Sequence, residues 1–470
     1  MREMGLRTRA YKSYFAAWEA LHLDAKEETF IHDDIPQYLW QHHPDGIAGL
    51  GLAQTIRSYE GFRSFITEMA ELLFPWTMPY FADHMSLHAH IKNGGRGIVL
   101  TAGNNQAPFL LTTIHTFRKL GCTLPIEIMY LGDEDLGQDY IAELENLDRV
   151  VARDMSAMVR DSGWKLRGWA AKPFAILLSS FREAIFIDAD SLFFRDPAVL
   201  FEDEDYKEKG ALFFRDRLFY PEKRAPFLQA ILQKPIPKGA TESRMWTGES
   251  GHQQESGVIV VDKSRHFIPM LLVTRLNGPD RDGNKGTGKV GVYELVYGDK
   301  ETFWLSWLLA GEEDFAFHRG SAAIMGIAHG RDEPLPDEMS DDCENPDTDR
   351  NVTEVAARCD MADYDGKTQV VICSSQLLHL DSEGKPLWLN GWLLKNKFKG
   401  PESGFAKFES YIMEPSDASL RKPASWNMYK GNRFCMMGDE DKKFDFTQEE
   451  LGVIDMIMDR AREVDKRWRQ

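Results

Sequence analysis

Apolar residues follow two different spacings along this chain, and the change comes near residue 94. Before it, segments such as RAYKSYFAAWEAL and YEGFRSFITEMAELLF place apolar side chains three or four residues apart. That spacing lines one face of an α-helix. We therefore predict that residues 1–93 form a helical N-terminal region, either a cap on the remainder or a stem-proximal segment.

Short apolar runs alternate with helical patterns after residue 94. Residues 97–101 and 125–131 are typical of buried strands, and residues 109–120 between them have helical spacing and stop at Gly121. This order predicts a βαβ unit, from which parallel sheets are built. The turn after the first strand lacks the G-x-G-x-x-G pattern, so the fingerprint of dinucleotide-dependent dehydrogenases is missing.

The same alternation continues to about residue 400. Helices are expected over residues 168–181 and 301–310, and strands over 184–188, 211–214 and 254–263. We predict an α/β protein with a Rossmann-like mixed sheet flanked by helices, formed by one domain over residues 94–400. Residues 401–470 are expected to be a helical and loop extension packed on that core.

Composition and charge narrow the class of partner. The chain has 470 residues, of which 43% are hydrophobic, so it can bury a large core. Its formal net charge is −18 and its isoelectric point is about 5.3. Because binding to phosphate backbones needs a basic face, this charge argues against a nucleic-acid partner. No run of 18 apolar residues predicts a membrane span.

The cysteines are few and have no zinc-ligand spacing. They are Cys122, Cys343, Cys359, Cys373 and Cys435. Cys343 and Cys359 flank an acidic, loop-like stretch, where a disulfide and a pair of free thiols are both open alternatives. The sequon Asn351-Val352-Thr353 lies between them and weakly favours the secretory pathway.

Two carboxylates follow a buried-strand pattern in the segment FIDADSLFF. Asp188 falls at the carboxyl end of the strand, where ligands bind in open α/β sheets. Asp190 is two residues on, so in extended chain both side chains point the same way and repel each other. A divalent cation such as Mg²⁺ or Mn²⁺ removes that repulsion and can bridge to substrate phosphates. The sequence therefore predicts a metal site that holds a diphosphate.

Several segments resemble one family of nucleotide-sugar-dependent enzymes with the GT-A fold. They are GIVLTAGNNQ, GWAAKPFAILLSSFREAIFIDADSLFFRDPAVLFE, GALFFRDR, QESGVIVVDK, GDKETFWLSW and HLDSEGKPLWLNGW. The chain is similar in these to the fungal Golgi mannosyltransferases that build mannan and glycoprotein outer chains. This resemblance implies a GDP-mannose donor, a mannose-containing glycan acceptor, Mn²⁺ with Mg²⁺ as the alternative, and retention of the donor's α configuration.

The resemblance leaves the linkage and the assembly open. The segment GALFFRDR favours an α-1,3 product, with α-1,2 transfer as the alternative. The family implies a type II protein of the Golgi lumen, with a membrane anchor outside this sequence, and a complex with other mannosyltransferases. A non-catalytic nucleotide-sugar-binding subunit of a mannan-polymerising complex is a second alternative. A metal-dependent hydrolase is a third, although it would need more clustered His and Asp ligands.

The resemblance assigns roles around the metal. It implies that Asp188 and Asp190 bind the ion, that Asp188 also contacts the donor, and that His379 is a third metal ligand. Related retaining transferases of the glycogenin type carry a His, a Gly and a Lys-Pro-Trp in this order, which implies that Lys385 grips the diphosphate. Trp388 comes one residue late for that pattern. The alternative for His379 is a buried histidine without a ligand role.

Further donor contacts are expected at strand ends. Lys172 precedes the strand that leads to Asp188, and its charge could offset that of the leaving group, with a solvated lysine as the alternative. The remaining donor-binding candidates are Thr101, Ala102, Gly103, Asp133, Ser256 and Gly257. Ser256 and Gly257 belong to a segment that resembles Asn-Ser-Gly beside the reacting sugar of the glycogenin type.

Three acids are candidates for catalysis. Glu255 replaces the Asn of the glycogenin-type segment, and it could orient donor hydroxyls or stabilise positive charge at the sugar's anomeric carbon. Asp299 and Glu301 open a tryptophan-rich helix, where an N-cap and a first-turn acid are the structural alternatives. Front-face attack by the acceptor and double displacement through Glu255 or Asp299 both stay open. Tryptophans expected to be core rather than sugar platforms are Trp304, Trp307, Trp388 and Trp392.

Overall fold

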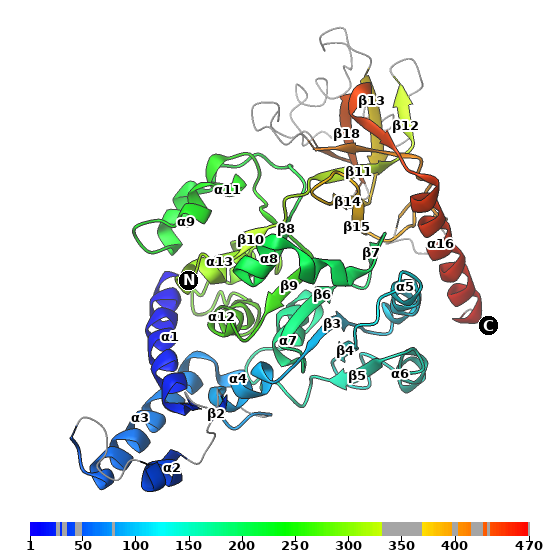
Figure 1. The fold of residues 1–470 in the computed structure, drawn as a ribbon. Coiled ribbons are helices and arrows are strands. Elements are labelled where there is room, and N and C mark those ends of the chain that lie inside the picture. The colour runs from blue at the N-terminus through cyan, green and yellow to red at the C-terminus, as the bar shows by residue number, and fades with distance from the viewer. Residues whose placement is uncertain are drawn as a thin grey trace.

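A computed structural model describes most of the chain. The described ranges are 1–24, 29–30, 35–42, 49–77, 80–330, 369–396, 403–414, 426–429 and 433–468. The cysteine pair Cys343 and Cys359 and the sequon at Asn351 lie outside the described residues. Figure 1 shows helices at the N-terminal end, a central sheet, and further sheets formed by the C-terminal part.

A seven-stranded mixed sheet forms the centre of the protein. Its strands, in spatial order, are β10 (Ala316–Phe317), β8 (Ala211–Arg215), β9 (Gln254–Asp262), β6 (Glu183–Ile187), β3 (Arg96–Thr101), β4 (Ile126–Tyr130) and β5 (Val150–Asp154). Strands β5, β4, β3 and β6 are parallel, and β9 runs antiparallel between β6 and β8. The expected α/β class with a mixed, helix-flanked sheet is confirmed, and the predicted strands are all present.

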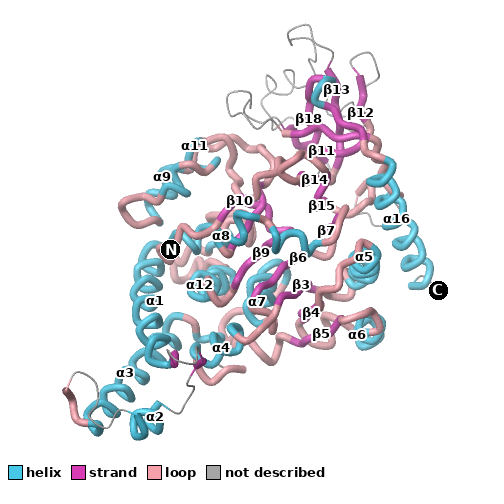
Figure 2. Tube along the Cα trace, viewed as in Figure 1, coloured by secondary structure: helices cyan, strands magenta, loops and turns pink. Residues whose placement is uncertain are grey.

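Helices cover both faces of this sheet (Figure 2). Side chains of β3 alternate, so that Ile98 and Leu100 pack with α5 on one face while Val99 joins the core on the other. The helices of residues 94–330 are α5 (Ala107–Lys119), α6 (Gln138–Glu145), α7 (Ala171–Leu178), α8 (Glu204–Lys209), α9 (Ala225–Ile231), α10 (Lys238–Thr241), α11 (Arg244–Thr247), α12 (Phe267–Asn277) and α13 (Thr302–Leu309). Helices α12 and α13 are almost wholly buried, which explains their continuous apolar sequences.

The N-terminal region is helical, as predicted. It contains α1 (Arg2–His22), α2 (Ile35–His42), α3 (Leu52–Leu73), α4 (His84–Lys92) and the two-residue strands β1 (Leu23–Asp24) and β2 (Thr29–Phe30). Helix α1 packs on the core through aromatic and polar contacts. Phe15 packs 5.2 Å from Phe267 between ring centroids, and Arg9 donates to the carbonyls of Leu308 and Leu309 at the end of α13. Helix α1 therefore packs against the carboxyl end of the tryptophan-rich helix α13.

Two antiparallel sheets stand above the central one. The six-stranded sheet has the order β19 (Lys443–Asp445), β16 (Ser410–Met413), β11 (Ala322–Gly326), β14 (Leu377–Leu380), β15 (Pro386–Asn390) and β7 (Ser191–Phe193). The four-stranded sheet has the order β12 (Ala328–Gly330), β13 (Gln369–Ser374), β18 (Arg433–Asp439) and β17 (Trp426–Tyr429). A disulfide between Cys373 and Cys435 joins β13 to β18.

The C-terminal part differs from the expected helical and loop extension. Strands β16 to β19 come from residues 410–445 and complete the two antiparallel sheets, so this part contains strands that were not expected. Helix α16 (Gln448–Trp468) fits the expectation, and it packs beside α5 (Figure 1). The short strands were missed because each has only three to seven residues, and because β16 and β18 pair with the distant strands β11 and β13.

The helices of the described residues include none that is long and apolar enough to cross a bilayer.

A buried ion pair joins the upper sheets to the loop after β8. Glu414 is 2% exposed and accepts from the Arg244 guanidinium at 2.5 Å, from the Leu218 amide at 3.1 Å and from the Trp426 indole at 2.9 Å. Arg244 also donates to the carbonyl of Asp216. The pair therefore holds this loop and β17 together.

We expect Glu414→Ala to lower the free energy of unfolding by about 3–5 kcal/mol, because it leaves the Arg244 guanidinium buried without its carboxylate. Guanidinium unfolding followed by circular dichroism measures this loss. Glu440→Ala, at an exposed position in the same part of the chain, serves as the control. Equal and small losses in the two variants would contradict the assigned role of Glu414.

Candidate active site

The Asp-x-Asp loop connects the central sheet to the six-stranded sheet. Asp188 follows β6 directly, and Asp190 precedes β7. The Asp188 amide donates to the carbonyl of Gly257 at 2.8 Å, which ties the loop to β9. The Asp190 carbonyl accepts from the amides of Gly391 and Trp392 at 3.2 and 3.0 Å. Both carboxylates are thus placed at the carboxyl end of β6, where the sequence predicted them.

Lys172 is the centre of the ion cluster around Asp188. Its ammonium lies 3.0 Å from Asp188 Oδ2 and 3.1 Å from Asp299 Oδ2. It also donates to the carbonyl and hydroxyl oxygens of Ser256 at 2.8 and 2.9 Å. We call Lys172, Asp188, Ser256 and Asp299 the Lys172 cluster. It joins the start of α7, the end of β6, the start of β9 and the segment before α13.

The cluster shifts the protonation equilibria of its members. Burial raises the pKa of Asp188 to about 7. The charges of Asp190 and Asp299 also raise this pKa, whereas the Lys172 ammonium lowers it. Burial works against the charge of Lys172, but Asp188 and Asp299 outweigh it and raise the pKa of the ammonium. The two acids of the cluster, together with the neighbouring Asp190, therefore outnumber its single cation.

A second ion group lies next to the first. Lys300 pairs with Glu255 and Asp216, each at 2.7 Å, and Asn390 donates to Glu255 Oε1 at 2.8 Å. The Gly257 amide donates to the same oxygen at 2.9 Å. Burial opposes the charge of Glu255, but Lys300 dominates and holds the pKa of this carboxyl well below its ordinary value. We call Glu255, Lys300, Asp216 and Asn390 the Lys300 cluster.

Two buried polar atoms beside Gly257 lack a hydrogen-bond partner in the described structure. Ser191 Oγ and Asn390 Oδ1 are buried and make no hydrogen bond within the described structure. Both residues contact Gly257, where a Cβ would lie 3.0 Å from Ser191 Oγ and 3.2 Å from Asn390 Nδ2. Buried polar groups are nearly always paired, so these atoms are suited to contact a bound molecule or ordered water. Glycine at 257 therefore leaves room for both side chains.

The residues after β15 are held in a conformation that costs energy. Trp392 adopts φ of +61°, although it is not glycine, and Gly391 precedes it with φ of +112°. Such backbone persists only where the surroundings fix it, and it is common at functional sites. Here it lets both amides face the carbonyl of Asp190. The Asp-x-Asp loop is therefore fixed from two sides, by β9 and by the turn after β15.

A divalent cation fits the two aspartates, although the expected three-ligand set is not assembled. Among the described residues, no three His, Cys, Asp or Glu side chains are close enough together to hold a metal ion. Mg²⁺-like ions are commonly held by one or two carboxylates together with substrate phosphates, so Asp188 and Asp190 suffice for that type of site. The metal role of these residues stays a prediction.

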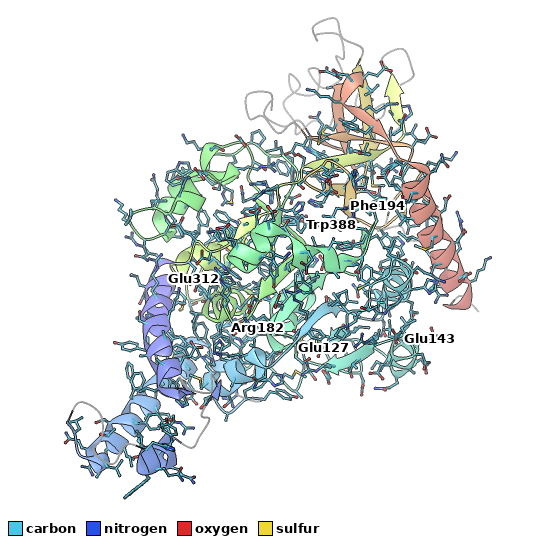
Figure 3. All side chains as sticks on the ribbon, viewed as in Figure 1. Glu127, Glu143, Arg182, Phe194, Glu312 and Trp388 are labelled. Carbon is cyan, nitrogen blue, oxygen red and sulfur yellow. A yellow bond between two sulfur atoms is a disulfide. The ribbon has the colours of Figure 1, made fainter. Side chains whose placement is uncertain are left out.

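His379 lies in the layer between the sheets rather than at the loop surface. It is 2% exposed, and its ring stacks on Trp388 at 4.1 Å between centroids. Trp388 lies where the central and upper sheets meet (Figure 3). Burial lowers the pKa of His379 to about 3, so the ring is neutral, and its Nε2 makes no hydrogen bond within the described structure. A neutral ring nitrogen of this kind keeps the capacity to bind a metal.

Lys385 is not among the residues of either cluster. It lies in the turn between β14 and β15, its side chain is 63% exposed, and its ammonium pairs with Glu383 at 2.7 Å. The local Lys-Pro pattern suggested a diphosphate contact, but here Lys172 and Lys300 are the cations near Asp188 and Glu255. A donor contact by Lys385 stays a prediction.

The nucleoside-side candidates follow β3 and β4 as expected. Thr101 ends β3, and Ala102 and Gly103 form the turn before α5. Asp133 is exposed and accepts from Gln138. The neighbouring Asp135 was not singled out from the sequence, yet it is the acid that faces Gly103, where a Cβ would lie 2.7 Å from its carboxylate. Asp133 and Asp135 both lie in the run GDED, and their spacing in the sequence does not show which of them faces Gly103.

Two predicted catalytic acids have different surroundings. Asp299 does not cap α13 with its side chain, which turns to Lys172, whereas its carbonyl accepts from the Thr302 amide. Glu301 is buried, and its carboxylate accepts from the amides of Gln253 and Gln254 and from the Trp304 indole. Through these hydrogen bonds Glu301 joins the start of β9 to α13. The tryptophans Trp304, Trp307, Trp388 and Trp392 are all buried, as expected of core residues.

The sequence of the chain matches a known protein family. Residues 95–381, which contain every predicted site residue except Lys385, match the family model described as "Mannosyltransferase putative". The chain belongs to this family. The expected GT-A-type fold agrees with the order of the seven-stranded sheet, in which one antiparallel strand interrupts a parallel series.

Named relatives share part of their length with this chain. Alpha-1,3-mannosyltransferase MNN1 of Saccharomyces cerevisiae is 26% identical over 64% of this chain and 41% of its own. Alpha-1,3-mannosyltransferase MNT3 of the same yeast is 26% identical over 68% of this chain and 50% of its own. The chain thus spans half or less of these relatives' length. The X-ray structure of the mannosyltransferase Ktr4p from S. cerevisiae aligns with 48% of this chain and 69% of its own, at 12% identity and a TM-score of 0.31.

The surroundings of Glu301 predict a dependence of folding stability on pH. Burial raises the pKa of Glu301 from its ordinary 4.5 to about 7. Between these values the unfolded state loses the proton first, so ionisation favours unfolding. Protonated Glu301 contributes fully to the free energy of unfolding below pH 4.5. Roughly 3 kcal/mol of that contribution is lost as the pH rises through about 7.

Glu301→Gln removes this titration, so its unfolding free energy should fall less with pH than that of the wild type. Guanidinium unfolding at a series of pH values between about 4.5 and 8 measures both slopes. Glu242→Gln, at an exposed position, is the control for loss of one acid. Parallel slopes in the wild type and Glu301→Gln would contradict the assigned pKa.

Proposed function

We propose that the protein is a retaining, metal-dependent glycosyltransferase that moves mannose from GDP-mannose to a mannose-terminated glycan and forms an α-1,3 linkage. Membership of the mannosyltransferase family supports sugar transfer, and the relatives' names support the α-1,3 linkage. The observation that carries the proposal is the Asp-x-Asp loop, fixed at the end of β6 beside Lys172. α-1,2 transfer is the alternative within the same family.

The two aspartates and Lys172 would act on the leaving diphosphate. Asp188 and Asp190 would hold Mn²⁺, with Mg²⁺ as the alternative, and the bound ion would supply positive charge for the diphosphate. Lys172 is already ordered by Asp188, Asp299 and Ser256, so it needs no rearrangement to present its charge. Preorganised charge of this kind stabilises a leaving group more than a mobile surface lysine does.

Glu255 would act on the sugar. Its carboxylate is ionised and buried, and it lies beside Ser256 and Gly257 of β9. Sugar transfer develops positive charge at the anomeric carbon, which a fixed carboxylate stabilises. Both oxygens of Glu255 already accept hydrogen bonds, from Gly257 and Asn390 on one side and from Lys300 on the other. These bonds weaken it as a nucleophile, so they support front-face attack in which the leaving phosphate takes the acceptor's proton.

The family also bears on location and partners. Relatives of the chain are yeast mannosyltransferases, which supports a place in the secretory pathway. We propose the Golgi lumen, with an anchor outside this sequence, and association with other mannosyltransferases. A non-catalytic, nucleotide-sugar-binding subunit of such a complex is the alternative function.

The proposal is tested by incubating the protein with GDP-mannose, Mn²⁺ and α-mannobiose, with and without EDTA, and analysing products by NMR. We expect a new α-1,3-mannosidic linkage that EDTA abolishes and that Asp190→Asn loses. Asp148→Asn, at a position whose side chain is 74% exposed, is the control. A β-linked product or transfer that is insensitive to EDTA would contradict the proposal, and GDP binding without turnover would favour the subunit alternative.

Lys172→Met should lower kcat by about 100-fold, because it removes a preorganised charge from the leaving-group side. It should also raise the pKa of Asp188 further, since the opposing ammonium is gone. Initial rates against GDP-mannose concentration measure the first effect, with thermal unfolding as a check of the fold. Lys207→Met, on the exposed side of α8, is the matched control. An unchanged kcat in Lys172→Met would refute the role.

A further inference from the structure

Most large aromatic side chains of this protein are buried, but three are exposed beside the Lys172 and Lys300 clusters. Trp169 and Tyr297 are each 62% exposed, and Tyr220 is 56% exposed. With the partly buried rings of Phe219 and His252 they form a row that we call the aromatic platform. Single exposed apolar residues are ordinary, whereas a group of them marks a binding surface.

The rings of the platform follow one another at contact distance. The centroid of Tyr297 lies 6.1 Å from that of Trp169 and 5.7 Å from that of His252. His252 stacks on Phe219 at 4.8 Å with 7° between the ring planes, and Tyr220 lies 6.4 Å from His252. The row therefore runs from the segment before α7 to the loop after β8 and offers several adjacent rings.

The platform is continuous with the clusters that bind the proposed donor. Trp169 lies in the 3₁₀ turn η2 (Gly168–Ala170), immediately before the helix that carries Lys172. Tyr297 is two residues before Asp299, the other partner of Lys172. His252 Nδ1 lies 4.0 Å from Glu301 Oε1. A molecule seated on these rings would thus reach the edge of the site where the sugar is transferred.

Local backbone structure holds these rings in place. Gly298 adopts φ of +62°, and a Cβ there would lie 3.3 Å from the Trp169 indole, so glycine lets the two segments approach. Tyr220 adopts φ of +52°, which is unfavourable for a bulky residue. The amide of Gly251 donates to its carbonyl at 2.7 Å, and Ser250 donates to the carbonyl of Phe219. The exposed rings are therefore presented by a constrained backbone.

We propose that the aromatic platform binds mannose residues of the acceptor glycan. A pyranose ring has one face of C–H groups, which packs on an aromatic ring, while its hydroxyls remain at the edge for polar partners. The platform supplies such rings, and Lys300, whose side chain is 22% exposed, supplies a polar group at its border. This inference rests on the proposed function, since the occupant is identified by the platform's position beside the transfer site.

Acceptor kinetics and direct binding test the platform together. Trp169→Ala and Tyr297→Ala should each raise the acceptor KM by about 5- to 10-fold, the size of one lost aromatic contact. The KM for GDP-mannose should stay unchanged, and Trp169→Phe should recover most of the acceptor affinity. The loss should be larger for α-mannotriose than for methyl α-mannoside, because the longer glycan covers more rings. Trp40→Ala, which removes a 68% exposed tryptophan from α2, is the matched control.

Saturation-transfer NMR with α-mannobiose measures acceptor binding without turnover and separates the two proposals. Binding that the platform variants lose, in a protein that transfers no mannose, would refute the proposed function and support the platform. Transfer with an acceptor KM that is unchanged in both alanine variants would overturn the platform alone. No mannoside binding by the wild type would overturn the platform as well.

Discussion

The arrangement of this site depends on one buried ammonium group. Lys172 joins four segments that are distant in sequence, and two of its partners are the carboxylates of Asp188 and Asp299. An uncompensated buried charge costs several kcal/mol, so the position of Asp188 and that of Asp299 are coupled through this cation. The start of α7, the end of β6 and the segment before α13 are therefore fixed together.

That constraint explains why the Asp-x-Asp loop can serve a ligand. The loop leaves the central sheet at β6 and enters the six-stranded sheet at β7, so both sheets determine its path. Gly257 on one side and the strained turn at Gly391 and Trp392 on the other hold its backbone. With the backbone fixed, burial raises the pKa of Asp188, and the nearby Asp190 and Asp299 raise it further. A bound cation would offset both effects.

The sequence predicted the fold's central elements because their signals are local. The apolar run before Asp188 and the glycine-entered run at 254–263 are both buried strands, and the Asp188 amide donates to the carbonyl of Gly257. The partners of these residues were not predictable, since Lys300 and Asp216 are 84 residues apart in the chain. Such pairs are set by the packing of β8, β9 and α13, for which a single sequence holds no direct signal.

Local motifs do not show what tertiary context decides. The Lys-Pro pattern at Lys385 predicts a phosphate contact, and the segment forms a hairpin turn in which the Lys385 ammonium is exposed and pairs with Glu383. The weak apolar alternation after residue 400 did not reveal the short strands β16 to β19, of which β16 pairs with β11 and β18 pairs with β13, both earlier in the chain. The exposure of Trp169 and Tyr297 was not predicted, because large aromatic residues are usually expected in the core.

The central claim is that the Asp-x-Asp loop holds a divalent cation together with a nucleoside diphosphate, and Mn²⁺ titration followed by electron paramagnetic resonance tests it most directly. In the presence of GDP, the wild type and Asp148→Asn should bind Mn²⁺ equally, and Asp190→Asn should bind it at least about tenfold more weakly, as expected when one of two carboxylate ligands is lost. Equal Mn²⁺ affinity in all three proteins would contradict the account.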